Sequence, residues 1–258
     1  KQQADVAGMA QRLYQAASSD PEMVAQHPYL TNKKVAGIAT QAGCRVQKKA
    51  LLIPLTDATG AIWNLQQIDP TGGKAFMPGG RIKGLVWLIG DSSRVALCEG
   101  PATALAITQA GDSAACSFGT KNLLEAAKTL IDMGKTIRIA ADNDPSGIKA
   151  AQAVHTALGC PIIHPAIEGW DFNDLLCNEG IEAVQAALAG PAQIDWPDPQ
   201  PLPEGAPTVE AFPLALLPDV LRPWIADIAD RLQCPPDYPA VAAIVALAAI
   251  VGRKVGIR

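Results

Sequence analysis

The spacing of apolar residues changes along the first ninety residues, and each spacing predicts a different element. Over residues 4–19 the apolar positions recur every three or four residues, which is typical of an amphipathic helix. Those positions are Val6, Met9, Leu13 and Ala16. Residues 50–55 and 61–68 are instead short apolar runs of strand length, separated by a polar turn. With a further strand predicted at 85–89, this part is expected to be a small α+β unit.

From Arg94 onward, strand-like and helix-like segments alternate. Strands are predicted at 95–98, 113–117, 136–141 and 161–164, and helices at 101–110, 122–133, 146–158, 171–178 and 181–188. Repeated strand–helix units predict a mainly parallel sheet that is flanked by helices. We therefore expect an α/β fold for this part of the chain.

The last quarter of the chain departs from this alternation. Six prolines fall within residues 190–210, which is typical of an extended, semi-rigid linker. Helices are predicted to follow, and the run 240–251 is apolar on all sides, so we expect it to be buried against something. That run is shorter than the roughly 20 residues that span a bilayer. The expected parts are an α+β subdomain at 1–93, an α/β domain at 94–189, a linker at 190–211 and the start of a helical domain at 212–258.

The net charge of −4 conceals an uneven distribution. Residues 1–90 carry 10 lysines and arginines against 5 aspartates and glutamates, whereas residues 91–189 carry 6 against 12 and residues 190–258 carry 5 against 8. A basic segment next to an acidic one is typical of a protein that binds a polyanion with one part and metal ions with another. Charges on solvated surfaces can vary as much, so the asymmetry needs support from specific residues.

Cysteine usage and the first residues bear on the cellular compartment. The six cysteines form no C-x-x-C pair and several stand in apolar surroundings, so we expect reduced thiols that pack as small apolar side chains, and no zinc site. The chain begins at Lys1 and lacks the pattern of a signal peptide. We therefore expect a cytoplasmic protein with no membrane partner, and a piece of a longer polypeptide.

The acidic residues that could carry chemistry follow directly after predicted strands. They are Glu99 after the first strand of the parallel sheet, Asp142 and Asp144 after the third, and Asp171 and Asp174 after the fourth. Carboxylates gathered where parallel strands end can bind hard cations through their oxygens. The structural alternative makes Asp144 the N-cap of the next helix and leaves Glu99 in solvent. Three motifs on successive units favour the cation site.

These three motifs resemble those of the Toprim domain of primases and topoisomerases. They read Leu97-Cys-Glu99-Gly100, Ala140-Ala-Asp142-Asn-Asp144-Pro-Ser-Gly147 and Gly169-Trp-Asp171-Phe-Asn-Asp174. Within that family the sequence is similar to primases of phages, plasmids and mobile elements. Upstream motifs extend the resemblance to about 27–189, namely His27-Pro-Tyr-Leu30, Lys33-Lys34, Leu52-Ile-Pro-Leu55, Asn64-Leu-Gln-Gln-Ile68, Lys74-Ala-Phe-Met-Pro-Gly-Gly80 and Lys83-Gly84. The segment after the linker resembles the opening of a helicase-associated region.

The resemblance implies template-directed primer synthesis with Mg²⁺, or Mn²⁺ in its place, on single-stranded DNA with nucleoside triphosphates and a replicative helicase as partner. Asp142 and Asp144 would be metal ligands, and Glu99 a third ligand or the general base near the primer 3′-hydroxyl. Asp171 and Asp174 would complete a second metal site. We further expect Lys74, Arg81 and Lys83, on the turn-rich segment before the domain, to contact template phosphates or the incoming triphosphate.

The sequence departs from the family pattern at several points. Thr103 stands where bacterial replicative primases often have an acid, which puts the second metal in doubt. The zinc ribbon that usually precedes the primase core and most of the helicase-associated region are missing from the sequence, and so is the P-loop of an ATP-driven motor. Two alternatives therefore stay open: a Toprim nuclease that cleaves phosphodiesters with the same metals, and a non-catalytic DNA-binding module that serves a helicase.

Overall fold

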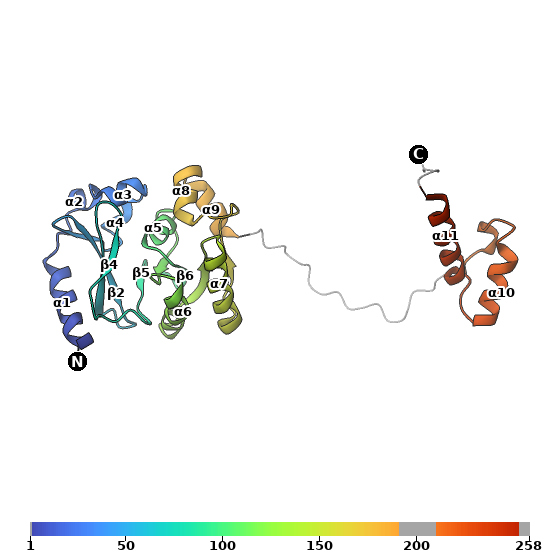
Figure 1. Ribbon diagram of the computed structural model, residues 1–258, viewed down its shortest axis with the longest axis horizontal. Helices are drawn as coiled ribbons and strands as arrows, with labels where there is room; N and C mark the ends of the chain where they lie inside the picture. Colours follow the sequence, from blue (N-terminus) through green and yellow to red (C-terminus); the bar gives the residue numbers. More distant parts are fainter. Residues whose placement is uncertain (1, 191–209, 253–258) are drawn as a thin grey trace. The chain divides into compact units, whose positions relative to one another are not determined.

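Two β-sheets form the framework of the first part of the chain (Figure 1). The computed structural model describes residues 2–190 and 210–252. The chain divides into two compact units, Lys1–Ile194 and Asp195–Arg258. Most of the linker predicted at 190–211 lies outside the described residues, and the four predicted parts stay a prediction.

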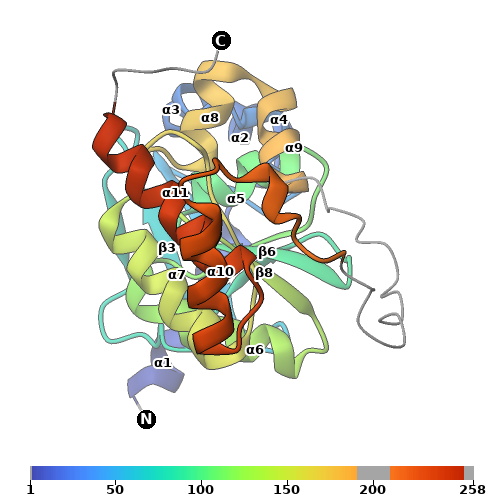
Figure 2. The same ribbon diagram turned by 90° about the vertical axis from the view of Figure 1, so that its right-hand side faces the viewer.

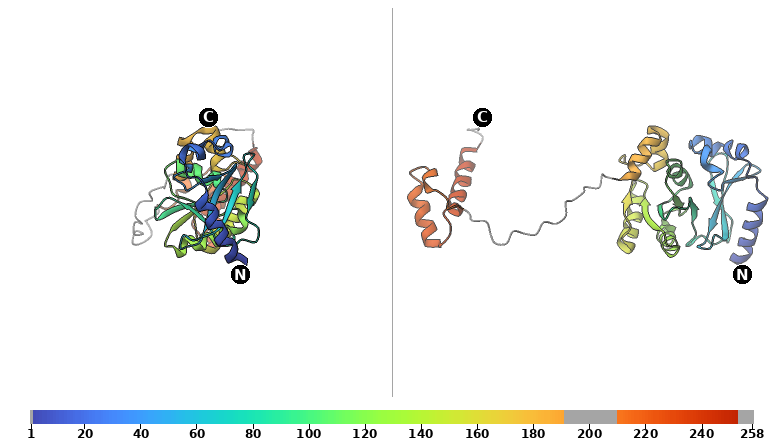
Figure 3. Two further views of the ribbon diagram at one scale, coloured as in Figure 1. Left: turned by 90° about the vertical axis from the view of Figure 1, so that its left-hand side faces the viewer. Right: turned by 180° about the vertical axis from the view of Figure 1, so that it is seen from behind.

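The N-terminal sheet has four antiparallel strands in the order β1-β2-β3-β4. Their bounds are β1 Arg45–Gln47, β2 Ala50–Thr56, β3 Ile62–Ile68 and β4 Lys74–Phe76. Helix α1 (Gln2–Ala16) packs across one face of this sheet, as the left view of Figure 3 shows, over Leu52 and Leu65. Three short helices pack against the other face, α2 (Pro21–Ala25), α3 (Pro28–Asn32) and α4 (Ala36–Ala39).

Helix α1 differs in two respects from its prediction. It ends at Ala16 instead of running to residue 19, because Ser18 forms a β-bridge with Val46 and exchanges backbone hydrogen bonds with it. Met9, which was expected on the buried face, is 47% exposed, while Ala10 is fully buried. A small side chain therefore faces the sheet at the point where helix and strands approach closely.

The second sheet has five strands in the order β5-β7-β6-β8-β9. Their bounds are β5 Trp87–Ile89, β6 Arg94–Cys98, β7 Ala114–Cys116, β8 Thr136–Ala140 and β9 Ile162–Ile163. Strands β6 to β9 are parallel, and β5 pairs antiparallel with β7 at one edge. The predicted mainly parallel sheet flanked by helices is confirmed.

Helices cover both faces of the parallel sheet (Figure 2). One face carries α5 (Pro101–Gln109), α8 (Phe172–Glu179) and α9 (Ile181–Ala189), and the other carries α6 (Leu123–Asp132), which follows the 3₁₀ turn Thr120–Asn122, and α7 (Pro145–Leu158). The chain thus passes from one face to the other between β6 and β8, the neighbouring strands at the centre of the sheet.

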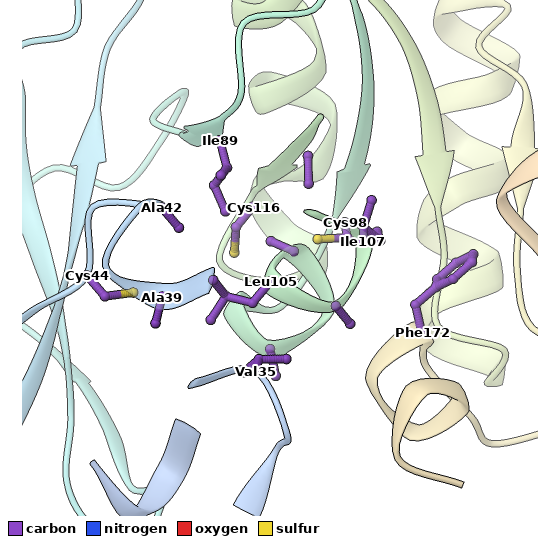
Figure 4. Packing of buried hydrophobic residues seen from close by; sticks show 14 of the residues in the cluster. Val35, Ala39, Ala42, Cys44, Ile89, Cys98, Leu105, Ile107, Cys116 and Phe172 are labelled. Carbon is purple, nitrogen blue, oxygen red and sulfur yellow. The ribbon is translucent and has the colours of Figure 1, made fainter. Parts of the chain in front are cut away.

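One apolar core joins the N-terminal part to the parallel sheet. Figure 4 shows Val35, Ala39 and Cys44 from the N-terminal part in the same cluster as Leu105 of α5 and Cys116 of β7. The join is reinforced by polar contacts, because the Trp87 indole donates to the Ala42 carbonyl at 3.0 Å and Thr56 bridges to Val86. The basic and acidic parts of the sequence are therefore packed against each other over a buried apolar interface.

The second unit contains the 3₁₀ turn Leu214–Leu216 and two helices, α10 (Arg222–Leu232) and α11 (Asp237–Val251). The prediction that residues 240–251 are buried is wrong for most of the run. Ala240 and Ala243 pack with Ile225 of α10, but Ile244, Val245 and Ile250 are between 51% and 80% exposed. A single partner helix covers only one stripe of a helix that is apolar all round.

Two further features concern the thiols and the length of the helices. Every cysteine is free, and Cys44, Cys98, Cys116 and Cys160 are buried. Among residues 2–190 and 210–252, no helix combines the length and the apolar character that crossing a bilayer requires.

The shared core yields a first prediction. Replacing the fully buried Leu105 by Ala leaves a cavity between the two sheets, so we expect the free energy of unfolding to fall by about 2–4 kcal/mol. Urea unfolding followed by circular dichroism measures this change. Ile131→Ala is the control, because that side chain is 41% exposed on α6 and its loss should cost less than about 1 kcal/mol. Equal losses for the two variants would contradict the shared core.

Candidate functional site

The carboxylates lie where the chain changes faces of the parallel sheet. Glu99 follows β6 directly, Asp142 follows β8 after one residue, and β6 and β8 are hydrogen-bonded neighbours. Helix α5 leaves β6 toward one face and α7 leaves β8 toward the other, so these two strand ends mark the switch point of the sheet. Ligands of open α/β sheets bind at such switch points.

Backbone pairing brings the third acidic loop to the same edge. The N–H of Asn143 donates to the Trp170 carbonyl at 2.9 Å, and the N–H of Gly169 donates to the Asn143 carbonyl at 2.6 Å. This pairing places Asp171 beside the loop that carries Asp142. Asp142 and Asp171 come about 40 and about 70 residues after Glu99 in the sequence, so the edge collects carboxylates from three separate segments.

Asp144 serves the start of α7. Its Oδ1 accepts hydrogen bonds from the N–H groups of Ser146 and Gly147, both at 2.8 Å, and these bonds hold the pKa of the carboxyl below its usual value. The N-cap alternative is thus correct for Asp144, yet its second oxygen stays available. Gly147 is required by the same turn, because a Cβ there would lie 2.5 Å from the Asp142 carbonyl oxygen.

Asp171 and Asp174 form a reciprocal cap at the start of α8. Asp171 Oδ1 accepts from the N–H of Asp174 at 2.7 Å, and Asp174 Oδ2 accepts from the N–H of Asp171 at 3.2 Å. The adjacent Phe172 is fully buried and anchors the turn in the core. Asp171 Oδ2 accepts a further bond, at 3.1 Å, from the Thr103 hydroxyl on α5.

At this edge, Glu99 and Asp142 each have a raised pKa and a buried carboxylate oxygen without a hydrogen-bond partner among the described residues. Burial raises the pKa of Glu99 to about 7, with a further contribution from the charge of Asp144. Burial also raises the pKa of Asp142 to about 7, followed by repulsion from Glu99, Asp171, Asp144 and Asp174. Glu99 Oε1 and Asp142 Oδ1 are buried without a hydrogen-bond partner among the described residues. The solvated Glu99 of the structural alternative is not what the fold contains.

These features fit a divalent cation. Buried carboxylate oxygens that lack donors, under repulsion from one another, are what an oxygen-coordinated cation would stabilise. In the side-chain positions that the structure gives for residues 2–190 and 210–252, no three acidic, histidine or cysteine groups are gathered closely enough to enclose an ion. A cation bound between Glu99 and Asp142 would relieve the repulsion that contributes to the raised pKa of Asp142.

The three predicted basic residues have different surroundings. Lys74 is exposed on β4, with its Nζ 5.6 Å from the centre of the Tyr29 ring. The Arg81 guanidinium lies 5.3 Å from the Trp63 ring, and its Nε donates to the Lys83 carbonyl. Lys83 Nζ lies 3.6 Å from Glu125 at the start of α6, and its side chain is 79% exposed. Arg81 and Lys83 are thus neighbours that already contact protein groups.

Lys74 lies on the side of the carboxylates. Phe76, two residues on, contacts Phe118 of the loop after β7 edge-on, with ring centres 6.1 Å apart. The buried Cys116 beneath this loop has a pKa raised to about 12, chiefly by burial, with Lys74 lowering it and Asp142 and Glu99 raising it. The Cys116 thiol also donates to the Glu99 carbonyl at 3.3 Å, so the loop that Phe76 contacts adjoins the strand end that carries Glu99.

Two residues of this region were not identified from the sequence as contributors. Thr103 appeared only as a missing acid, although its hydroxyl contacts Asp171. Tyr29 is 6% exposed beneath Lys74, and its hydroxyl has no hydrogen-bond partner among the described residues. Both depend on contacts between segments that are distant in sequence, and a pattern of neighbouring residues carries no signal for them.

A polar pocket lies near the opposite, amino ends of the strands. It is lined in part by Arg94, Asp112 and Arg138. Arg138 and Asp112 form an ion pair there, so the arginine is already neutralised. The unsatisfied charge of the parallel sheet is found at the carboxylate edge.

The raised pKa values yield a prediction for the protein without divalent ions. Replacing Asp142 by Asn removes a partly buried charge, so the free energy of unfolding at pH 8 in EDTA should rise by about 1–2 kcal/mol. The folded carboxyl titrates near pH 7 and the unfolded one near 4, so wild-type stability is lost as the pH rises through that window. The gain should therefore shrink as the pH falls toward 5.

Urea unfolding between pH 5 and 8 measures this gain. Asp132→Asn is the matched control, because Asp132 is exposed at the end of α6 and should change little at any pH. An Asp142→Asn variant that is less stable than wild type at pH 8, or a gain that is constant with pH, would disprove the strain assigned to this carboxylate.

Comparison with known proteins bears on the identity of this edge. Residues 94–182 match the family model described as Toprim domain. Two proteins of Escherichia coli named DNA primase TraC are each 30% identical to this chain, over 146 and 158 residues. These matches cover 52% and 54% of this chain but only 14% and 11% of the relatives. The chain thus spans a small part of the length of the relatives it matches.

Solved structures of primase fragments have a fold similar to that of this chain. A DnaG primase catalytic domain bound to ssDNA matches with a TM-score of 0.53 and 17% identity, over 72% of this chain and 78% of that one. The primase fragment of the bacteriophage T7 primase-helicase matches with a TM-score of 0.51 and 15% identity, over 63% and 74%. Both matches cover more than half of this chain and show a similar fold. Residues 94–182 therefore match the Toprim domain model, within a chain that is similar in sequence to the two DNA primase TraC proteins and similar in fold to primase catalytic fragments.

Proposed function

We propose that this chain is the catalytic part of a Mg²⁺-dependent DNA primase that makes primers for the replication of a plasmid, phage or other mobile element. The observation that supports this most directly is the pair of partnerless, buried oxygens on Glu99 and Asp142, at the switch point of a Toprim sheet. Such a pair is destabilising unless a cation binds there. A structural role alone offers no reason to keep it.

Each acidic residue has a proposed part in the reaction. Mg²⁺, or Mn²⁺ in its place, would be held by Asp142, Asp144 and Glu99, with Asp171 and Asp174 at the side nearest α8. A divalent ion at such a site stabilises charge on the attacking and leaving oxygens of a nucleotidyl transfer. In the alternative role, Glu99 would be the general base that accepts the proton of a primer 3′-hydroxyl.

The basic N-terminal part would hold the nucleic acid. Lys74 stands beside the carboxylate edge, and we assign it to the phosphates of the template or of the incoming triphosphate. Arg81 and Lys83 would extend this basic surface along the segment between the two sheets. The template would be single-stranded DNA, which the similar DnaG domain binds. A replicative helicase, in the same polypeptide or separate, would supply it in the cytoplasm.

Primer synthesis tests the proposal. The chain, mixed with single-stranded DNA, labelled ribonucleoside triphosphates and Mg²⁺, should form short labelled products that disappear in EDTA. Asp142→Asn and Glu99→Gln should each reduce the rate at least about 100-fold, because each removes a group that contacts the reacting atoms or their cation. Asp132→Asn, with the same chemical change at an exposed position, should retain the wild-type rate.

The same assay separates the alternatives. Incubation with labelled DNA and Mg²⁺ but no nucleotides should leave the DNA intact; cleavage that depends on Asp142 would establish the nuclease instead. DNA binding with neither synthesis nor cleavage would favour the non-catalytic module. Synthesis that survives Asp142→Asn would remove the carboxylate edge from the mechanism.

The placement of Lys74 is tested by binding. Lys74→Ala should weaken binding of a fluorescein-labelled oligodeoxythymidine about 3–5-fold and lower the slope of log K against log salt by about 0.7, as expected for one lost contact to a single-strand phosphate. Fluorescence anisotropy between 50 and 200 mM salt measures both. Lys128→Ala, which removes an exposed lysine that pairs with Glu125 on α6, is the control. Equal effects of the two variants would show that Lys74 acts only through overall charge.

A further inference from the structure

Thr103 makes a contact that its position in a helix does not require. It lies in the first turn of α5, is 1% exposed, and its Oγ1 donates to Asp171 Oδ2 at 3.1 Å. The two residues are 68 positions apart in the sequence. The bond therefore joins the helix that follows the Glu99 strand end to the cap of α8.

This bond completes the restraint of the Asp171 carboxylate. Oδ1 accepts the N–H of Asp174 at 2.7 Å, and Oδ2 accepts the Thr103 hydroxyl. A carboxylate with one donor can satisfy that donor over a range of orientations, whereas donors at both oxygens from two different helices restrict its plane much more closely. Because each carboxylate oxygen has two lone-pair sites, Oδ2 keeps one for a further ligand.

The charge of the donor matters at this position. The negative charge of Asp171 is one of the contributions that raise the pKa of Asp142, so the two carboxylates share one field. A lysine or arginine donor would also restrain it, but would neutralise the negative potential that attracts a cation. The threonine hydroxyl restrains the carboxylate and leaves the charge of the cluster unchanged.

We propose that Thr103 is a positioning residue, which fixes the Asp171 carboxylate so that Oδ2 presents a free lone pair to the divalent cation beside Asp142. This inference rests on the proposed function, because it assumes that the carboxylate edge binds a cation. It assigns the hydroxyl at position 103 a role as support for a metal ligand, in place of a further carboxylate.

Direct binding of Mn²⁺, followed by electron paramagnetic resonance of the free ion, tests the role of the hydroxyl without relying on activity. Thr103→Val keeps the shape of the side chain but removes the hydroxyl, and should weaken Mn²⁺ binding about 10-fold, the lower end of the effect of losing a group that orients a ligand. Thr103→Ser restores the hydroxyl and should bind within about twofold of wild type.

Thr108→Val is the matched control. It removes a threonine hydroxyl from the same helix, where that hydroxyl donates to the Ala104 carbonyl, and should leave Mn²⁺ affinity unchanged. Melting temperatures in EDTA are recorded for every variant, so that a loss of stability is measured separately from a loss of affinity. Thr103→Ala provides a second side chain without a hydroxyl if the valine variant does not fold.

The outcomes distinguish this inference from the proposed function. Mn²⁺ affinity that is unchanged in Thr103→Val or Thr103→Ala overturns the positioning role, even if the melting temperature falls. A serine variant that binds as weakly as the valine variant overturns it too, because the methyl group would then be what matters. If Asp142→Asn binds Mn²⁺ as tightly as wild type, the cation site itself is wrong, and both proposals fail.

Discussion

Repulsion between carboxylates at the ends of two neighbouring strands is the constraint on which the rest of this structure depends. Glu99 and Asp142 follow β6 and β8, which are adjacent and parallel, so the hydrogen bonds of the sheet hold the two side chains near each other. Burial raises the pKa of both groups, and the charge of Glu99 raises that of Asp142 further, so ionising both carboxyls in the folded state costs stability. The free energy of unfolding is lower by this cost whenever no cation is bound.

The neighbouring acids Asp144 and Asp171 are stabilised by local hydrogen bonds. Asp144 is engaged by two backbone N–H groups, and Asp171 by one backbone N–H and one hydroxyl. Each of these carboxylates therefore has donors of its own, while Glu99 Oε1 and Asp142 Oδ1 have none among the described residues. The first two carboxylates are held in place by these donors, and the partnerless oxygens of the other two are the ones that gain most from a bound cation.

Much of this arrangement could be predicted from the sequence, because it follows from local patterns. Alternating strands and helices predict the parallel sheet, and an acid directly after a strand can only lie at its carboxyl end. The antiparallel β5, the contact of Thr103 with Asp171 and the stacking of Lys74 over Tyr29 could not be predicted, since each depends on where a distant segment packs. The burial expected for residues 240–251 failed for a related reason: hydrophobicity indicates that a surface favours burial but does not supply the partner that covers it. The roles of the site residues remain predictions.

The apolar core that Val35 and Cys44 share with Leu105 has a consequence for binding. It fixes the spacing between β4, which carries Lys74, and the strand ends that carry the carboxylates. The entropy of aligning a cationic side chain with an anionic cluster is thus lost once, when the chain folds, and not again at each encounter with a ligand. A molecule that carries several phosphates and a bound cation would meet the lysine and the carboxylates at a spacing that is already fixed. Its affinity would then reflect preorganisation more than the number of contacts.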